Sequence, residues 1–217
     1  MRQSASVDVR IDIFSVNNKY RSFQLQQTFS ESLRQSISRN RVTLSFTGAA
    51  FFLYFALPSR TSVLAGIPFI ILGEIMRTWA SGYIKKNEEL SQNGPYAITR
   101  NPLYVGNFLI GVGFSIMTSR VLLILFYLAA FIYIYKLTIQ NEEKFLSAKF
   151  GETFSRYKER VPVFFPIKIL SSGSASNEKT DSHFSWQLVL KHREYNTWLG
   201  IIAGLIIFLV KLAFKGT

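Results

Sequence analysis

The sequence has no cysteine and only two histidines, His183 and His192, among its 217 residues. The lack of cysteine excludes disulfides, thiol catalysis and cysteine-ligated metals. Two histidines late in the chain are too few for a histidine-rich metal site, so we expect no metal. Acidic residues are also scarce: 13 Asp and Glu stand against 25 Lys and Arg, which gives a net charge of +12.

The basic residues do not form one patch with interleaved aromatics, which argues against nucleic acid as a partner. They lie between apolar runs, as the positive-inside rule describes for membrane proteins. Hydrophobic residues make up 48% of the chain, and several runs approach the roughly 20 residues that cross a bilayer. The predicted fold is an all-α integral membrane protein with cytoplasmic interfacial helices and the lipid bilayer as a partner. We expect about five transmembrane helices, at about residues 42–58, 62–84, 102–118, 120–140 and 196–214.

The composition divides the chain into four segments. The first carries apolar residues at every fourth position beside arginines, which is typical of a basic amphipathic helix on a membrane surface. The third is Ser-rich, which is typical of a flexible linker. No cleavable signal peptide is expected, because the first apolar run begins only near Val42. The predicted segments are a cytoplasmic N-terminal segment (1–41), a core of four spans and a polar helix at about 141–159 (42–166), the linker (167–195) and a C-terminal transmembrane helix (196–217).

The distribution of basic residues predicts the orientation. If the N-terminus is cytoplasmic, the inner segments carry twenty Lys and Arg and the outer segments carry four. The positive-inside rule then predicts an odd number of spans and an external C-terminus. In the last span, Gly200 and Gly204 form a GxxxG pair, which permits close packing within the bundle or a homodimer.

The start of the third span carries residues that suit an anionic ligand. Asn101 is a good N-cap and Pro102 fits the first helical position. The positive end of the helix dipole and the side chain of Arg100 would both favour a carboxylate. The alternative is a capped helix with an arginine that reaches the membrane surface. Gly106, Gly111 and Gly113 follow on the same helix and would let a flat group approach the backbone.

Acidic residues at the end of the fourth span suit a cationic ligand. Glu142 and Glu143 diverge by about 100° around a helix, so one can bind a ligand ammonium while the other holds a basic partner. The alternative is an acidic first turn of the next helix, which the helix dipole favours. Glu74 and Arg77 lie three apart in the second span, where they can pair. That pair is either functional or a structural ion pair near the cytoplasmic end.

Taken together, these motifs resemble the isoprenylcysteine carboxyl methyltransferase and phospholipid methyltransferase family of integral membrane enzymes. The resemblance covers about residues 94–166 and is carried by NGPYAITRNPLYVGN and, further along, NEEKFLSAKFGETFSRYKERVPVFFP. The sequence departs from the family where Asn101 replaces a typical His and Phe154 a common Tyr. The Asn form resembles bacterial members of unassigned substrate, so the expected location is a bacterial inner (plasma) membrane with the active site on the cytoplasmic side.

The resemblance implies S-adenosylmethionine as cofactor and methyl transfer to a lipid or other hydrophobic acceptor at the cytoplasmic face. Arg100 and Glu143 are the expected catalytic residues, for orienting a carboxylate acceptor or assisting an amine. Whether Glu74 and Arg77 line the acceptor site stays open. The alternatives are a small multi-pass transporter or a non-catalytic scaffold of the same fold. The expected cofactor-binding residues are Tyr96, Arg100, Asn101, Pro102, Tyr104, Gly106, Gly111, Gly113, Glu142 and Glu143.

Overall fold

A computed structural model describes residues 48, 50–85, 89–164 and 183–215. The chain divides into two units, Met1–Phe51 and Phe52–Thr217, and the following description concerns the second. The amphipathic helix expected within 1–41, most of the first span and the Ser-rich stretch lie outside the described residues.

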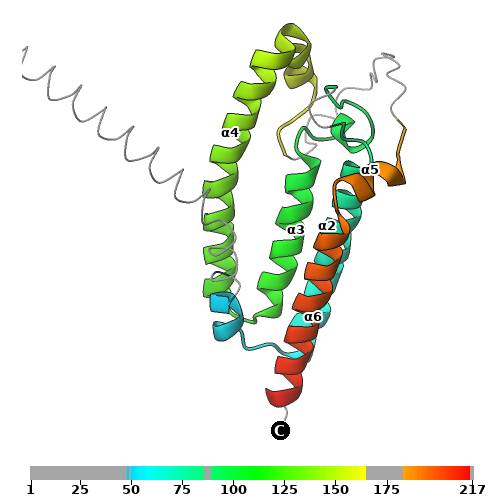
Figure 1. Cartoon of the computed structure of the whole chain (residues 1–217). Coiled ribbons are helices and arrows are strands. Elements are labelled where there is room, and N and C mark those ends of the chain that lie inside the picture. Colours follow the sequence, from blue (N-terminus) through cyan, green and yellow to red (C-terminus); the bar gives the residue numbers. More distant parts are fainter. Residues whose placement is uncertain (1–47, 49, 86–88, 165–182, 216–217) are drawn as a thin grey trace, which may run out of the picture. The chain divides into compact units, whose positions relative to one another are not determined.

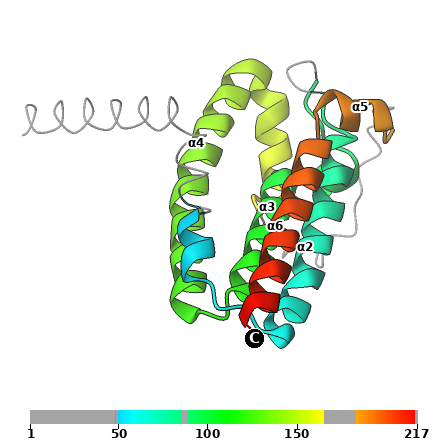
Figure 2. The ribbon, with the colours of Figure 1, turned by 60° about the horizontal axis from the view of Figure 1, so that its bottom comes forward.

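The described part of the second unit is built from helices joined by loops, without a β-strand among those residues. In both Figure 1 and Figure 2, α4 lies on one side of α3, and α2 and α6 lie on the other side. The all-α prediction is confirmed. The helices are α2 (Arg60–Ser81), the short 3-10 helix η1 (Gly94–Ala97), α3 (Pro102–Met117), α4 (Val121–Arg160), α5 (Trp186–Lys191) and α6 (Tyr195–Lys215).

Three of the described helices, α2, α4 and α6, are long and apolar enough to cross a membrane. Helix α3 is apolar but has only 16 residues, which corresponds to about 24 Å of helix. That is shorter than the roughly 30 Å hydrocarbon core of a bilayer. Three of the five expected spans therefore meet the length requirement, and α3 is a short apolar helix packed beside them.

Helices α2 and α3 run antiparallel and meet at two pairs of glycines. A Cβ atom added to Gly106 would lie 2.6 Å from the carbonyl oxygen of Gly73, and one added to Gly113 would lie 2.7 Å from that of Gly66. Small residues let membrane helices approach closely, because dispersion contacts then form between the backbones. The neighbour that requires glycine at these two α3 positions is therefore α2.

This packing predicts that Gly106→Ala destabilises the protein, whereas Gly200→Ala does not. An added methyl at Gly106 must displace the backbone of α2, and overpacking of this kind costs about 1–3 kcal/mol. A Cβ at Gly200 meets nothing within 4 Å, and alanine is the better helix former there. Thermal unfolding of the two variants in the same detergent measures the difference. Equal melting temperatures would contradict the close contact.

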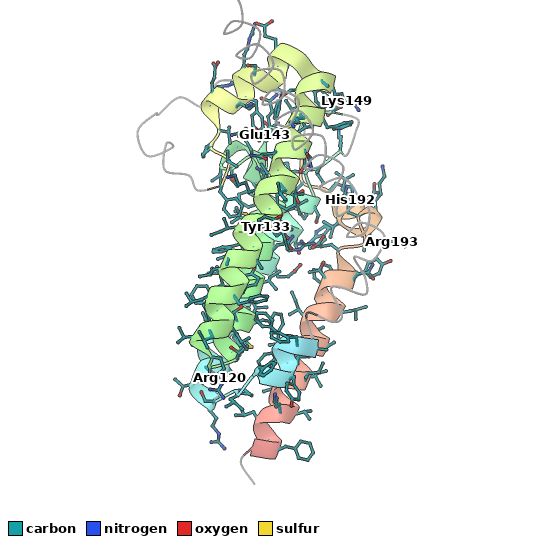
Figure 3. The ribbon with its side chains drawn as sticks, turned by 90° about the vertical axis from the view of Figure 1, so that its left-hand side faces the viewer. Arg120, Tyr133, Glu143, Lys149, His192 and Arg193 are labelled. Atoms are coloured by element: carbon teal, nitrogen blue, oxygen red, sulfur yellow. The ribbon has the colours of Figure 1, made fainter. Side chains whose placement is uncertain are left out.

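Helix α4 is longer than the sequence predicted. A polar helix was expected to begin near residue 141, but α4 runs through that point and breaks only at Gly151, where φ is 50° and ψ is −121°. No glycine or proline lies between Val121 and Phe150 to end the helix earlier. Figure 3 shows Glu143 and Lys149 toward one end of α4 and Arg120 before its start. Glu142 and Glu143 thus lie in mid-helix, and the interpretation as an acidic first turn is wrong.

The GxxxG pair in α6 has one packed and one open member. A Cβ atom on Gly204 would lie 2.8 Å from the ring of Phe114, whereas Gly200 faces open space. Gly204 therefore serves close packing within the bundle, which was one of the two uses expected of it. The homodimer stays a prediction.

Candidate functional site

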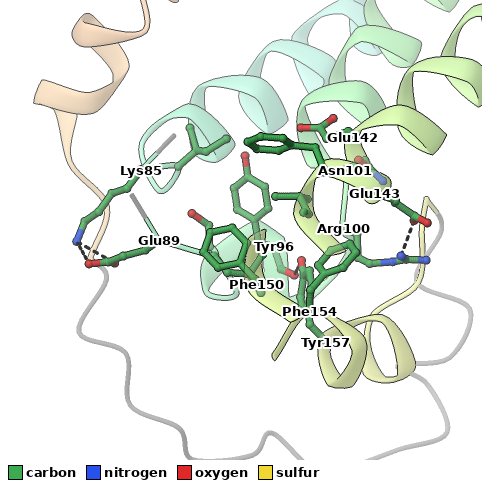
Figure 4. Close-up of a pocket in the computed structure, with 15 residues that line it drawn as sticks. Lys85, Glu89, Tyr96, Arg100, Asn101, Glu142, Glu143, Phe150, Phe154 and Tyr157 are labelled. Carbon is green, nitrogen blue, oxygen red and sulfur yellow. Dashed lines mark hydrogen bonds and ion pairs between the residues drawn. The ribbon is translucent and has the colours of Figure 1, made fainter. Parts of the chain in front are cut away.

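A pocket of about 200 Å³ lies at the end of the bundle where α2 ends and α3 begins. Figure 4 shows its lining side chains converging from the loop after α2, from η1, from the start of α3 and from α4. The polar lining residues are Lys85, Glu89, Ser91, Tyr96, Arg100, Asn101, Glu142 and Glu143, and the apolar wall includes Leu146, Phe150, Phe154 and Tyr157.

Local chain chemistry holds η1 and its tyrosine in place. Gly94 adopts a positive φ of 59°, and a Cβ there would meet the ring of Tyr83 at 2.7 Å, so glycine is required on both counts. Pro95 is buried at the second position of η1, within its first turn. The Tyr157 hydroxyl donates a 2.7 Å hydrogen bond to the carbonyl of Tyr96. The GPY segment is thereby fastened to the last turns of α4.

The loop after α4 returns to the start of α3. The backbone N–H of Arg100 donates to the carbonyl of Pro162 at 2.9 Å, and the Thr99 hydroxyl donates to the carbonyl of Val163 at 3.1 Å. The Asn101 amide Nδ2 donates to the same carbonyl at 3.0 Å. Asn101 occupies the N-cap position but its side chain makes no cap hydrogen bond, so the predicted capping role is wrong. The Asn101 side chain instead donates its hydrogen bond to the loop that follows α4.

Arg100 is the central basic residue of the pocket. Its side chain is 10% exposed and its Nη1 lies 2.5 Å from Oε1 of Glu143. Its Nε is buried and has no hydrogen-bond partner within the described part of the chain, and the same holds for the hydroxyl of Tyr96. Burial also raises the pKa of Tyr96 above the usual phenol value, so the hydroxyl stays protonated. Two donors at the pocket are therefore unsatisfied, which is costly unless a ligand supplies acceptors.

The two adjacent glutamates differ in their partners. Glu143 is engaged by Arg100 and also lies 3.7 Å from Nζ of Lys158. Glu142 accepts a 2.8 Å hydrogen bond from the Tyr104 hydroxyl, which carries no charge. Glu142 therefore has no basic partner among the described residues, which leaves it available to a cationic ligand group. The expected division, in which one glutamate holds a basic partner, is what the geometry shows.

The structure brings together five of the ten predicted site residues in the pocket lining: Tyr96, Arg100, Asn101, Glu142 and Glu143. Tyr104 reaches it through its hydrogen bond to Glu142, and Pro102 is buried at the start of α3. The two residues expected to be catalytic, Arg100 and Glu143, are paired with each other.

The glycines of α3 do not belong to the pocket lining. Gly106 and Gly113 pack on α2, as described above, and a Cβ on Gly111 would meet the Tyr127 ring. Their assignment as cofactor-binding residues is replaced by a role in helix packing, because a neighbouring helix occupies the space that a ligand would need. Lys85, Glu89 and Ser91 were not anticipated. They carry no motif, and only the folding of the loop after α2 brings them to the pocket.

Glu74 and Arg77 do not pair with each other, contrary to the sequence interpretation. Arg77 pairs with Glu194 at 2.7 Å, donates to Asn107 and donates to Thr197 at 3.1 Å. Glu74 accepts hydrogen bonds from Trp198 and Thr78. Residues three apart on a helix face neighbouring directions. Here Arg77 and Glu74 each bind a partner from outside α2, which is Glu194 for Arg77 and Trp198 for Glu74.

Parts of the chain are similar to known proteins. Residues 69–153 match the family model for phospholipid methyltransferases. The chain is 35% identical over 113 residues to the cobalt-zinc-cadmium resistance protein CzcN of Cupriavidus metallidurans, covering 51% of this chain and 52% of the relative. It is 29% identical over 114 residues to protein-S-isoprenylcysteine O-methyltransferase of Xenopus laevis, covering 47% and 40%. The chain thus spans about half the length, or less, of these curated relatives. No solved structure gives a significant match.

The helical bundle is that of a membrane protein. Over residues 69–153 the chain is similar to the phospholipid methyltransferase family. The resemblance predicted from the GPY, R-N-P and E-E motifs is confirmed, and the matched segment includes Tyr96, Arg100, Glu142 and Glu143.

Proposed function

We propose that the pocket binds S-adenosylmethionine and that the chain transfers its methyl group to a lipid or other hydrophobic acceptor. Similarity to a methyltransferase family supports this, but the single observation that carries it is a pair of unsatisfied donors. Arg100 Nε and the Tyr96 hydroxyl are buried without partners in the same pocket that Glu142 lines. Donors for an anion beside an unneutralised carboxylate suit a ligand with both a carboxylate and an ammonium.

The residues present fit the chemistry of this cofactor. Arg100 and Tyr96 would donate to its carboxylate, and Glu142 would accept from its ammonium. Phe150 and Phe154 offer an apolar wall for the adenine. The pocket of about 200 Å³ is smaller than the ~300–1,000 Å³ usual for small-molecule sites. Binding therefore requires the pocket to widen, and Gly151, which faces open space at the break in α4, is where α4 can change direction.

The cofactor would supply an electrophilic methyl group, and the residues of the chain would orient the reactants and exclude water. Arg100 and Glu143 neutralise each other at 2.5 Å. An acceptor carboxylate that recruited Arg100 would release Glu143, and an acceptor amine that recruited Glu143 would release Arg100. The charges of Arg100 and Glu143 would therefore balance each other until the acceptor binds one of the two residues.

Calorimetric titration of detergent-purified protein with S-adenosylhomocysteine tests the cofactor assignment. We expect saturable binding to the wild type and an affinity at least tenfold lower in Glu142→Gln, which keeps the size of the side chain but removes the charge. Glu152→Gln is the matched control, because Glu152 also lies on α4 but is exposed and pairs with Arg156. Absence of binding to the wild type would refute the proposal. If the wild type binds, turnover of labelled cofactor with a lipid extract would distinguish an enzyme from a scaffold or a transporter.

The positions of the charged groups support an orientation with the pocket end on the cytoplasmic side of a plasma membrane. Among the described residues the pocket end carries Lys85, Arg100, Lys144, Lys149, Arg156 and Lys158. The opposite end carries Arg60 at the start of α2, Arg120 before α4 and Lys211 near the end of α6. Basic groups concentrate on the cytoplasmic side of membrane proteins. The open face of α6 at Gly200 leaves a surface for a second copy.

A second candidate function, a role in tolerance of heavy-metal ions, is favoured by the similarity to CzcN and to the nickel-cobalt-cadmium resistance protein NccN of Alcaligenes xylosoxydans xylosoxydans, 36% identical over 110 residues. We propose that such a role, if present, acts through methylation of a membrane component. Growth in cobalt of a deletion strain complemented with wild type or Arg100→Ala tests this. Full complementation by the variant would instead favour a non-catalytic scaffold.

A further inference from the structure

A second cavity, a groove of about 640 Å³, lies between α2 and α6. Its lining is almost entirely apolar, and Ile71, Ile75 and Ile202 are each more than half exposed there. All three tryptophans of the chain contribute to it, at positions 79, 186 and 198. An exposed apolar groove of this kind on a membrane protein faces either lipid tails or a hydrophobic ligand.

One polar feature distinguishes the groove from a surface made for lipid tails alone. Glu74 lines it, and its Oε1 accepts hydrogen bonds from the Trp198 indole at 2.6 Å and the Thr78 hydroxyl at 2.9 Å. Its Oε2 is buried and has no partner within the described part of the chain. A carboxylate oxygen in apolar surroundings is costly unless a donor reaches it. The groove therefore lacks one hydrogen-bond donor.

The charge of the lining decides which donor fits. Glu74 is the sole ionisable group among the described lining residues, and neither lysine nor arginine occurs among them. The nearby Arg77 is already engaged by Glu194 and Asn107. A lipid phosphate or carboxylate would therefore be repelled by Glu74 and would find no counter-ion in the groove. A ligand that carries a cationic group and no anionic group is not repelled by Glu74.

We propose that this groove is a binding site for a long-chain primary amine, an amphiphile with an ammonium at one end and no phosphate. The ammonium donates to Oε2 of Glu74, and the alkyl chain lies along the isoleucines of α2 and α6. Charge-assisted bonds of this type are the stronger class of hydrogen bond, and the apolar lining offers dispersion contacts to the alkyl chain.

The groove is distinct from the pocket that would hold the cofactor. The two cavities share no lining residue. One wall of the groove comes from α6 and from Phe184 and Trp186 before it, which lie beyond the family match at 69–153. The amine site therefore depends on neither cofactor binding nor methyl transfer.

Intrinsic tryptophan fluorescence reports on this groove because every tryptophan lines it. We would titrate oleylamine into the purified full chain in nanodiscs at pH 7, and in parallel oleyl alcohol, oleic acid and phosphatidylethanolamine. We expect a saturable change with oleylamine at a concentration at least tenfold below that needed for any of the other three. Equal responses to the amine and the alcohol, or tighter binding of phosphatidylethanolamine, would overturn the proposal.

The variant Glu74→Gln separates the charge from the fold. Glutamine still offers an acceptor to Trp198 and Thr78, so the groove keeps its internal hydrogen bonds, but the negative charge is lost. We expect oleylamine to bind this variant at least tenfold more weakly, with unchanged circular dichroism. The exposed Glu152→Gln is the control and should bind like the wild type. Undiminished amine binding by Glu74→Gln would refute the assignment, whatever the outcome of cofactor titrations.

Discussion

Arg100→Ala is expected to lower the affinity for S-adenosylhomocysteine by at least 100-fold and to abolish methyl transfer. The truncation removes the unpartnered Nε donor and also frees Glu143, which then faces the pocket with Lys158 as its remaining basic partner. A hydrogen bond to a charged group contributes about 1.5–3 kcal/mol, and tenfold in affinity corresponds to about 1.4 kcal/mol. Loss of one such donor together with an added repulsive charge accounts for the predicted size.

Calorimetry on Arg100→Ala, Arg100→Lys and Arg156→Ala checks this prediction. Lysine restores the positive charge but not the planar fork of donors, so we expect it to recover only part of the affinity. Arg156 lies on α4, and its ion pair with Glu152 is exposed to solvent, so its removal should leave binding within about twofold, as expected for surface pairs. Binding by Arg100→Ala that matches the wild type would place the ligand carboxylate elsewhere.

Glu194→Ala is expected to cause the largest loss of stability among single charge removals. Glu194 is 4% exposed, and its carboxylate is held by Arg77, whose side chain is 15% exposed. Removing one member of a buried pair leaves an uncompensated charge and costs about 3–5 kcal/mol. The pair also ties the start of α6 to α2, so its loss should loosen the C-terminal helix from the bundle.

Thermal unfolding in detergent, compared with Glu152→Ala, measures this effect. The double variant Arg77→Leu, Glu194→Leu should regain much of the lost stability, because an apolar pair of similar volume leaves no charge unpaired. A Glu194→Ala melting temperature equal to that of Glu152→Ala would show that Asn107 and Thr197 suffice as partners for Arg77.

Four of the residues that the sequence predicted for the site line one pocket. Tyr96, Arg100, Glu142 and Glu143 belong to the motifs, and the hydrogen bond from Tyr157 to Tyr96 and that from Arg100 to Pro162 show why these motifs occur together. Each motif alone had an ordinary structural explanation. Their convergence on one pocket depends on contacts between residues some sixty positions apart, which local patterns do not encode.

The errors have a common physical origin. Gly106 and Gly113 were assigned to a ligand, Asn101 to a helix cap, and Glu74 to Arg77, each from its nearest neighbours in the sequence. In the structure these groups contact distant parts of the chain instead. The glycines pack on α2, Asn101 donates to the loop at Val163, and residues of α6 bind Glu74 and Arg77. Glycine in a membrane helix indicates that another group packs closely against it. The sequence of that one helix does not show whether the group is a ligand or a second helix.

Helix α4 is apolar from Val121 to Tyr135, becomes polar from Lys136 onward and breaks at Gly151. The apolar stretch is suited to contact with lipid, whereas the turns after Gly151 are polar and contribute Phe154 and Tyr157 to the pocket wall. A ligand that enters by displacing only those last turns leaves the apolar stretch where it is. If the pocket holds the proposed cofactor, the rate of cofactor exchange should then respond to the viscosity of the aqueous phase and not to the fluidity of the bilayer.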